Sequence, residues 1–363
     1  MPKPLRDQVI VITGASSGIG RVTAREAAER GARVVLAARN TRDLHTLAEE
    51  VVRDGGEALA VATDVADEQQ VESLIEQAVE RFGRIDTFVA NAAVSTYSEF
   101  VDQPLDEFRR VVEVNFFGQA YCAKYALPLL RASAGAFISV GSTLSDRGVP
   151  LQAAYCASKH ALKGWIDSLR VELKHRRWPV RVTLIKPSSI NTPLFAKART
   201  RLGVQPQPIP PVYDPSLAAS AILHAAENDE RDVFVGGAGK VLSTAERASP
   251  KLVDIQQLRS GFDAQMTSWP KAADAPDNLF APVEYDGGER GEFVQGSRTS
   301  SVYQDVAAHS AAAPALAAAA LGAGALVARR AGNNGVLGAL LLTAAFLLAG
   351  RSALSAGYSG YSG

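Results

Sequence analysis

The chain has 363 residues, 47% of them hydrophobic and 21% charged, enough for one large α/β core with an appendage or for two domains. Lysine plus arginine equals aspartate plus glutamate at 38 each, so no net field points to a nucleic-acid partner. The two cysteines indicate a reducing compartment rather than a disulfide framework, and two thiols alone cannot form a cysteine zinc site. We therefore expect no metal centre.

Short apolar runs alternate with amphipathic segments along most of the chain. Runs this rich in β-branched residues are typical of buried parallel strands. They are Val9–Thr13, Arg33–Ala38, Ala58–Ala62, Thr87–Ala90, Ala136–Val140, Val180–Ile185 and Asp232–Val235. The segments between them, such as Thr41–Asp54 and Pro215–Glu227, are long enough for crossover helices. This alternation predicts an α/β fold with a doubly wound parallel sheet, the Rossmann fold.

A glycine-rich turn follows the first strand, with the sequence Gly14-Ala15-Ser16-Ser17-Gly18-Ile19-Gly20. Glycines at these positions allow a tight turn and close approach of the backbone to a pyrophosphate, whose charge faces the N-terminus of the next helix. A flexible loop without a ligand is the alternative. The place of the turn between a buried strand and an amphipathic helix favours nucleotide binding.

Arg39 ends the second strand, where an NAD-binding site normally carries an acidic residue for the ribose hydroxyl. A guanidinium at this point suits a 2′-phosphate, which it can bind through two charge-assisted hydrogen bonds. The alternative is a solvated arginine at the start of a helix. Arg39 therefore favours NADP(H) over NAD(H) as the cofactor, with NAD(H) left open.

Tyr155 and Lys159 lie four residues apart, so on a helix they share one face. A phenol normally ionises near pH ~10. A neighbouring ammonium is expected to lower the tyrosine pKa and bring the side chain into acid/base range. The pair alone has a plainer interpretation, because tyrosine and lysine at this spacing are common on solvated helices.

The motifs of the chain together resemble those of the short-chain dehydrogenase/reductase family. Thr13–Gly20, Asn91-Ala92-Ala93 and Tyr155-x-x-x-Lys159 occur in the order and spacing of that family, over about residues 5–240. The resemblance implies a Rossmann-fold oxidoreductase that acts on CH–OH donors with NAD(P). Family members usually form dimers or tetramers, so the resemblance also implies a homo-oligomer.

The resemblance assigns further residues, position by position. The cofactor contacts of the turn are Gly14, Ser16, Ser17, Gly18, Ile19 and Gly20. The other matching positions are Asp64 and Val65 at the adenine, Asn91 and Ala92 beside the cofactor, Asn115 in the proton relay, Ser142 as catalytic serine and Thr192 at the cofactor carboxamide. Two departures, Ala93 and Ser188 where the family often has glycine, concern local loop geometry and remove no catalytic group.

These assignments imply a mechanism in which Ser142 hydrogen-bonds the substrate carbonyl oxygen and Tyr155 protonates it as hydride arrives. Lys159 would hold the nicotinamide ribose hydroxyls and tune the tyrosine, and Asn115 would help hold a water that connects Lys159 to solvent. The expected reaction is the NADP(H)-dependent interconversion of a carbonyl and a secondary alcohol. The alternative is a non-catalytic NADP-binding module that its tail recruits to a membrane or to partners.

Composition divides the chain into four parts. We expect a catalytic domain over residues 1–261, a polar linker or loosely packed extension over 262–309, hydrophobic helices over 310–350 and a flexible tail over 351–363.

The hydrophobic part has two segments. Ala311–Ala328 is mostly alanine and glycine, and Val336–Ala349 is leucine-rich but short, whereas a transmembrane helix needs ~20 apolar residues. A membrane hairpin, a single or interfacial anchor, and helices packed on the enzyme or on a second subunit are the three alternatives. The N-terminus shows no apolar stretch of a secretory signal, and an apolar C-terminus after a polar linker suggests a tethered catalytic domain that faces the cytoplasm. A membrane location would favour lipophilic substrates.

Overall fold

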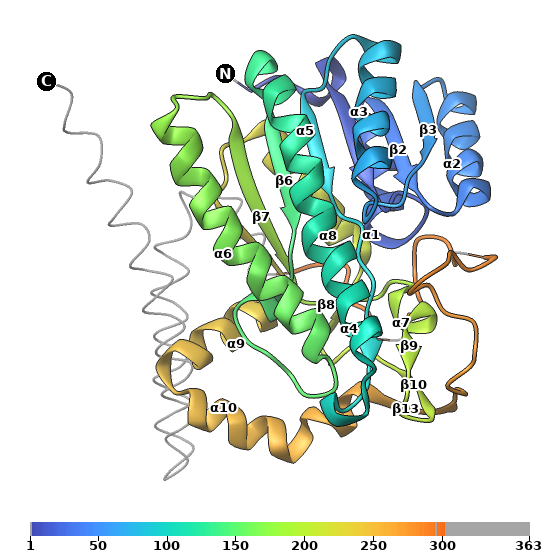
Figure 1. Ribbon diagram of the computed structural model, residues 1–363, viewed down its shortest axis with the longest axis vertical. Helices are drawn as coiled ribbons and strands as arrows, with labels where there is room; N and C mark the ends of the chain where they lie inside the picture. The colour runs from blue at the N-terminus through green and yellow to red at the C-terminus, as the bar shows by residue number, and fades with distance from the viewer. Residues whose placement is uncertain (1, 286, 295, 302–363) are drawn as a thin grey trace, which may run out of the picture.

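Seven strands form one parallel sheet in the computed structural model of the protein, which describes residues 2–285, 287–294 and 296–301 (Figure 1). The strands are β1 (Val9–Thr13), β2 (Arg33–Ala38), β3 (Ala58–Ala62), β4 (Thr87–Ala90), β6 (Ala136–Val140), β7 (Arg181–Pro187) and β12 (Asp232–Val235). Their order across the sheet is β12-β7-β6-β4-β1-β2-β3. The expected strands are confirmed, although β7 continues two residues beyond the expected end at Ile185.

Helices cover both faces of this sheet (Figure 1). One face carries α1 (Gly18–Glu29), α2 (Thr41–Arg53) and α8 (Pro215–Glu227), whose buried residues belong to one hydrophobic cluster. The other carries α3 (Glu68–Phe82), α4 (Leu105–Val112), α5 (Gly118–Ser133) and α6 (Ala153–His175), which contribute to a second cluster. The doubly wound α/β architecture is therefore confirmed, with β1, β4 and β6 buried along their whole length between the two clusters.

Local side chains fix where several helices begin. The Asn40 side chain accepts a hydrogen bond from the backbone of Asp43 at the start of α2, and Asp67 caps α3 in the same way. Asp214 accepts from the backbone of Ser216 at the start of α8. The strands are parallel, so their carboxyl ends lie at one edge of the sheet. The capped helix starts keep the loops at this edge short enough to build a site there.

The strand order reverses at β1, which pairs with β2 on one side and with β4 on the other. Ile12 lies opposite Leu36 in one pairing and opposite Val89 in the other. A crevice forms beyond the carboxyl ends of the strands at such a switch point, and ligands of open α/β sheets bind there.

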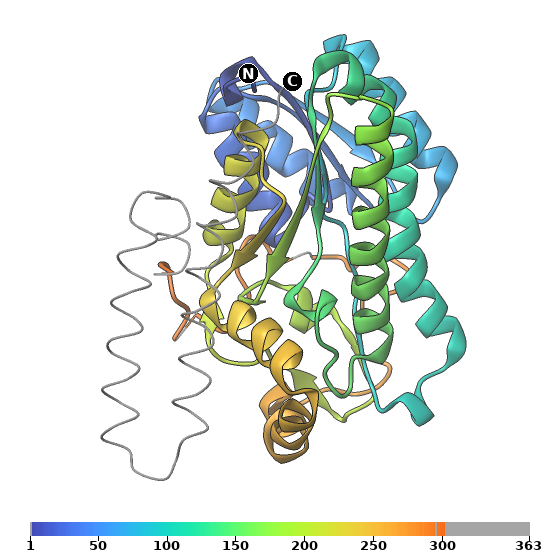
Figure 2. The ribbon, with the colours of Figure 1, turned by 90° about the vertical axis from the view of Figure 1, so that its left-hand side faces the viewer.

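Short elements surround this edge of the sheet. Around the crevice they are β5 (Thr96–Tyr97), η2 (Phe100–Asp102), η3 (Glu113–Phe117), η4 (Thr143–Ser145), β8 (Ser189–Ile190), α7 (Leu194–Lys197), β9 (Arg199–Thr200), β10 (Val204–Pro206) and β11 (Val212–Tyr213). A further short element, η1 (Leu5–Asp7), precedes the amino end of β1 instead. Figure 2 shows α9 (Gly237–Ala248) and α10 (Pro250–Gln256) below the same edge, and α10 continues into η5 (Gln257–Gly261). Together these elements close the crevice on the side away from the sheet.

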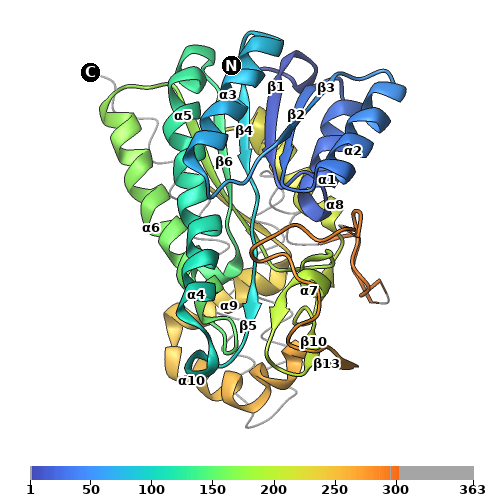
Figure 3. The same cartoon turned by 45° about the vertical axis from the view of Figure 1, so that its right-hand side comes forward.

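The segment after residue 261 makes specific contacts with the rest of the chain (Figure 3). After η6 (Asp263–Gln265), strand β13 (Met266–Pro270) pairs antiparallel with β10. Gln265 and Leu279 are fully buried. The described part of the expected linker is thus attached to the catalytic unit, while the division of the chain into domains stays a prediction.

Within the described residues, no helix has both the length and the apolar character that a membrane crossing needs. The segments on which the membrane hypothesis depends, within 310–350, lie outside the described residues, as does the tail 351–363.

Candidate active site

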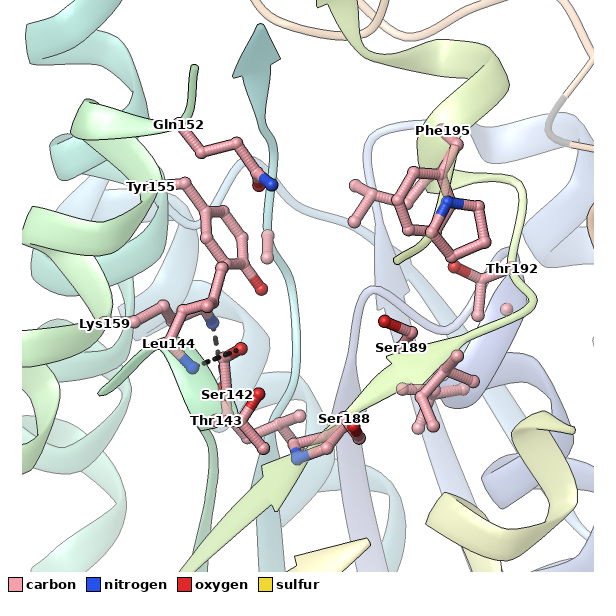
Figure 4. A pocket seen from close by; sticks show the side chains of 18 of the residues that line it. Ser142, Thr143, Leu144, Gln152, Tyr155, Lys159, Ser188, Ser189, Thr192 and Phe195 are labelled. Atoms are coloured by element: carbon pink, nitrogen blue, oxygen red, sulfur yellow. Dashed lines mark hydrogen bonds between the residues drawn. The ribbon is translucent and has the colours of Figure 1, made fainter. Parts of the chain in front are cut away.

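A cavity of about 690 Å³ opens at the carboxyl edge of the sheet, at the switch point. Its lining includes most of the residues that the sequence singled out: Gly14, Ser16, Ser17, Gly18, Ile19, Arg39, Asp64, Val65, Asn91, Ala92, Ser142, Tyr155, Lys159 and Thr192. Figure 4 shows Ser142, Tyr155 and Lys159 on one wall, with Thr192 and Phe195 on the opposite wall. Gly20 and Asn115 are not part of the cavity lining.

The glycine turn requires glycine for two different reasons. Gly14 and Gly18 have φ angles of 68° and 57°, in the left-handed region that side chains disfavour. Gly20 lies so close to the first glycine that a Cβ atom on it would be 2.2 Å from the carbonyl oxygen of Gly14. The helix can therefore begin directly at the turn, with its first N–H groups directed at the cavity edge.

Asn91 joins the turn to the neighbouring strand. Its Nδ2 donates to the carbonyl oxygens of Thr13 at 3.0 Å and Gly14 at 3.3 Å, and its backbone N–H donates to Thr13 Oγ1 at 3.0 Å. These contacts hold the ends of β1 and β4 together where the strand order reverses. The amide thus has the bracing geometry that the resemblance implied.

Ser142 and Tyr155 come from neighbouring elements. Ser142 follows β6 and caps η4, where its Oγ accepts a hydrogen bond of 3.0 Å from the backbone of Leu144. Tyr155 lies in the first turn of α6, and a hydrogen bond that its phenolic oxygen accepts from the Ser142 hydroxyl favours the phenolate. Lys159, one turn further along, is fully buried, and its Nζ lies 5.4 Å from the ring centre of Tyr155.

Burial dominates the ionisation of this pair. It raises the pKa of Tyr155 to about 12, against the opposing effect of the Ser142 hydrogen bond. It also lowers the pKa of Lys159 to about 7. The expectation that the lysine depresses the tyrosine pKa is therefore wrong for the protein alone, because a buried ammonium is itself disfavoured.

Asn115 occupies the π-helical turn η3, behind the cavity wall. Its Oδ1 accepts a hydrogen bond from the backbone of Val94 at 2.8 Å, and its Nδ2 donates to the Val94 carbonyl and to Ser158 Oγ. The side chain thereby links the loop after β4 to α6, which carries Tyr155. Its contribution to a proton relay stays a prediction.

The end of the cavity at Arg39 and Asp64 has contacts that sequence reasoning missed. Arg39 donates to the backbone carbonyls of Asn278 and Leu279. Arg110 pairs with the carboxylate of Asp64 and donates to the same Leu279 carbonyl at 3.1 Å. Both arginines thus hold a segment far away in the sequence, and no local motif around Arg110 indicated this contact.

We call the described residues 277–285 and 287–291 the strap; they belong to the orange segment in Figure 3, and Asn278 and Pro282 line the cavity. The N–H of Gly18 donates to the carbonyl of Gly288 at 2.9 Å, so the strap contacts the glycine turn itself. Three ion pairs fasten the strap, Arg25 with Glu289, Arg290 with Asp214 and Arg199 with Asp277, each at 2.7 Å. This stretch is polar, rich in glycine and proline and without periodicity, so its sequence did not indicate these contacts.

The other half of the cavity is uncharged and largely apolar, with Gln152, Gln207 and Gln257 among its lining residues. Its apolar lining residues are Val94, Tyr97, Leu144, Val149, Phe195, Ile209, Val241, Leu242, Leu252 and Val253. The charged residues of the described lining are Arg39, Asp64, Lys159 and Lys197, and Lys197 donates to Ser17 of the glycine turn at 2.7 Å. The space beyond Tyr155 therefore suits an uncharged, apolar molecule.

The fold and the cavity define a Rossmann-fold protein with a ligand site at the switch point, and comparisons with known proteins give its family. A family model described as short chain dehydrogenase matches residues 8–203. The uncharacterized oxidoreductase YxnA of Bacillus subtilis strain 168 is 42% identical over 271 residues, covering 74% of this chain and 76% of the relative. The 11-beta-hydroxysteroid dehydrogenase A of Sesamum indicum is 34% identical over 238 residues, covering 62% and 67%.

Solved structures agree with this similarity. The alcohol dehydrogenase from the archaeon Thermococcus sibiricus, complexed with 5-hydroxy-NADP, is 26% identical with a TM-score of 0.56, over 62% of this chain and 95% of that one. The chain belongs to the short-chain dehydrogenase/reductase family. It is an oxidoreductase that acts on CH–OH donors, in a family that uses NAD(P).

Proposed function

We propose that the protein interconverts a carbonyl compound and a secondary alcohol with NADP(H), using Ser142, Tyr155 and Lys159. The observation that carries this proposal is that these three side chains line the same cavity as the glycine turn. A hydride donor at the turn and an acid beside the carbonyl are the two requirements of ketone reduction, and one cavity of about 690 Å³ supplies room for both.

In the direction of reduction, Tyr155 acts as the proton donor. A pKa of about 12 keeps the proton on its hydroxyl at neutral pH, which is the form a general acid needs. Ser142 Oγ donates a hydrogen bond to the substrate carbonyl oxygen and stabilises the charge that develops on it. NADPH, when bound, supplies the hydride, Lys159 holds the ribose hydroxyls, and Asn115 supports the water that returns the proton.

The cofactor preference is for NADP(H). Arg39 lies at the cavity end of β2, where a ribose phosphate of a cofactor on the glycine turn would arrive. The Thermococcus sibiricus enzyme, with a similar fold, was crystallised with 5-hydroxy-NADP. The remaining cofactor contacts are the cavity-lining residues of the glycine turn together with Asp64, Val65, Asn91, Ala92 and Thr192.

The substrate is lipophilic. The wall beyond Tyr155 contains many apolar side chains together with uncharged glutamines, and the described charged residues of the lining lie on the proposed cofactor side or next to Tyr155. A charged substrate would lose its hydration there without gaining a partner.

The decisive test is NADPH oxidation by the purified protein with a panel of apolar ketones and aldehydes. Tyr155→Phe should abolish turnover and leave NADPH binding intact, because the substitution removes only the phenolic hydroxyl group that donates the proton. Tyr125→Phe is the matched control, since its hydroxyl contacts Glu68 outside the cavity. Full activity of Tyr155→Phe would contradict the mechanism, and tight NADPH binding without turnover of any carbonyl would favour the non-catalytic alternative.

We also propose that the C-terminal apolar segments associate the protein with a membrane, and that the catalytic units form a homo-oligomer. The first proposal rests on the composition of residues 310–350, the second on the habit of the family. Recovery of the full-length protein in the supernatant after carbonate extraction would contradict an integral anchor. A monomeric mass by light scattering would contradict the second proposal.

A further inference from the structure

The wall beside Tyr155 contains a polar side chain to which the proposed mechanism assigns no role. Gln152 is buried at 7% exposure, comes three residues before Tyr155, and lines the same cavity. Figure 4 shows its carboxamide extending from the wall above the tyrosine ring. A hydrogen bond with this carboxamide would therefore be made by a molecule that also faces Tyr155.

The orientation of this carboxamide follows from its neighbour Gln265. The Nε2 of Gln265 donates to the backbone carbonyls of Pro150 at 3.0 Å and Gly261 at 2.6 Å. Because carbonyls only accept, the amide group of Gln265 cannot be turned the other way. Its Oε1 must then accept, and it does so from Gln152 Nε2 at 2.7 Å.

The Oε1 of Gln152 is therefore available to accept a hydrogen bond from a molecule in the cavity. Its Nε2 is used by Gln265, and within the described part of the chain no donor reaches its Oε1. An acceptor in an apolar wall without a donor is costly unless a ligand or water satisfies it. The Oε1 of Gln152 is therefore an acceptor that a ligand with a hydrogen-bond donor could satisfy, on the same wall as Tyr155.

A second glutamine on the cavity wall repeats the pattern. Gln207 Nε2 donates to the backbone carbonyls of Ala264 and Met266, at 3.3 and 3.0 Å, so this side chain too is left with a free oxygen as its remaining polar group. Both glutamines are tied to residues 264–266, which lie beyond the family match. The buried Oε1 of Gln257 in the same lining also has no partner among the described residues. Residues 264–266 thus hold the side chains of Gln152 and Gln207 so that the carboxamide oxygens of both can accept hydrogen bonds from a ligand.

We propose that Gln152 is a specificity-determining residue whose carboxamide oxygen accepts a hydrogen bond from a hydroxyl group of the substrate. The substrate class is then an apolar ketone with a hydroxyl group close to the carbonyl, and the corresponding diol in the reverse direction. Gln265 is a positioning residue that holds Gln152 in this orientation. The inference rests on the proposed function, because it concerns the substrate of the same reaction.

A matched pair of ketones tests the inference. Benzoin and deoxybenzoin are both bulky and apolar and differ in one hydroxyl group next to the carbonyl. The wild-type protein should favour benzoin in kcat/KM by about ten- to hundredfold, the range expected for one hydrogen bond whose loss leaves a buried acceptor unpaired. Gln152→Leu should lower kcat/KM for benzoin by a similar factor and leave the value for deoxybenzoin within about threefold.

Two further variants separate specificity from structure. Gln265→Leu frees the Gln152 amide to turn and should reduce the preference for benzoin, while Gln77→Leu, on the exposed face of α3, should leave it unchanged. An equal loss for both ketones in Gln152→Leu would overturn the inference. So would a wild-type preference that the variant keeps.

The outcomes also distinguish the inference from the proposed function. Tyr155-dependent reduction of deoxybenzoin with no effect of Gln152→Leu on the ratio would support the function and overturn the inference. Affinities of both ketones for the NADP⁺-loaded protein are measured alongside turnover, since they report the hydrogen bond even for a ketone that is not reduced. Equal affinities would overturn the inference, and the broader carbonyl panel would then decide on the function independently.

Discussion

Lys159 and Val140 are joined by a hydrogen bond of 2.9 Å from the lysine Nζ to the backbone carbonyl at the end of β6. This bond joins the second turn of α6 to the end of β6. Ser142 comes two residues after that end. Among the described residues the ammonium has no carboxylate partner, and burial alone lowers its pKa to about 7. The position of the lysine is thus fixed while its charge depends on pH.

The first prediction is that capture of NADPH weakens as pH rises through about 7. The Lys159 pKa lies below its ordinary value of ~10.4, so the charged form that attracts ribose hydroxyls predominates only below about pH 7 in the free protein. Because kcat/KM for NADPH reports the free protein, it should fall on the alkaline side of that pH. Initial rates from pH 5.5 to 9 measure this profile.

The lysine one turn further along provides the control for that profile. Lys163 pairs with Asp146 and does not line the cavity, so Lys163→Ala should keep the inflection. Lys159→Ala should remove it and lower kcat/KM at acidic pH. A profile that stays level from pH 6 to 9 in the wild-type protein would argue against a charged Lys159 in cofactor capture.

A second prediction concerns Arg39. Arg39→Asp should weaken NADPH binding by about ten- to hundredfold, since it replaces charge-assisted hydrogen bonds to a phosphate with repulsion. NADH lacks that phosphate and should lose little affinity, so the ratio of the two dissociation constants is the measurement. Equal weakening of both cofactors would mean that Arg39 acts only through Asn278 and Leu279 of the strap.

Strong local patterns explain how much of this molecule could be predicted. The expected strand Ala136–Val140 and the expected helix Pro215–Glu227 have the observed bounds, because continuous burial and a proline at the first helical position leave a clear signal. Ser142, Tyr155 and Lys159 were singled out because the resemblance to the family assigns them, and the i,i+4 spacing places the last two on one helix face. Their shared cavity was predictable from topology, since carboxyl ends of parallel strands meet at one edge.

Irregular segments explain the rest. Gly288 reaches Gly18 across 270 residues of chain through one backbone hydrogen bond, and such a bond needs no particular side chain. Gln265 looks like an ordinary polar residue in a polar stretch, yet it is fully buried because three hydrogen bonds satisfy its amide. The predicted direction of the Tyr155 pKa shift was also wrong. The effect of burial on a pKa cannot be compared with that of a neighbouring charge before the packing is known.

The third prediction is that Gly20→Ala destabilises the protein and abolishes cofactor binding. The new Cβ would lie 2.2 Å from the Gly14 carbonyl oxygen and 2.7 Å from Asn91 Nδ2, so the turn must shift. We expect a loss of about 1–3 kcal/mol in the free energy of unfolding, as for other overpacked sites. Thermal melting and NADPH titration measure the two effects.

The control for that substitution is Gly164→Ala. Gly164 lies on the exposed face of α6 with nothing within 4 Å of a new Cβ atom, so this change should stabilise the helix by about 0.5–1 kcal/mol. If Gly20→Ala instead melted and bound NADPH like the wild-type protein, the close packing of the glycine turn would not be required.

The last prediction is that loosening the strap speeds cofactor exchange. Arg290 holds the strap to the cap of α8 through Asp214, and the neighbouring Glu289 holds it to α1 through Arg25. If the proposed cofactor binds at the glycine turn, these contacts are next to it, because the carbonyl of Gly288 accepts a hydrogen bond from Gly18 of the turn. Arg290→Ala together with Glu289→Ala should raise the NADPH dissociation rate several-fold in stopped-flow displacement. Arg30→Ala, which breaks only an exposed pair with Glu26, should not change it, and an unchanged rate in the double variant would show that release does not require the strap to move.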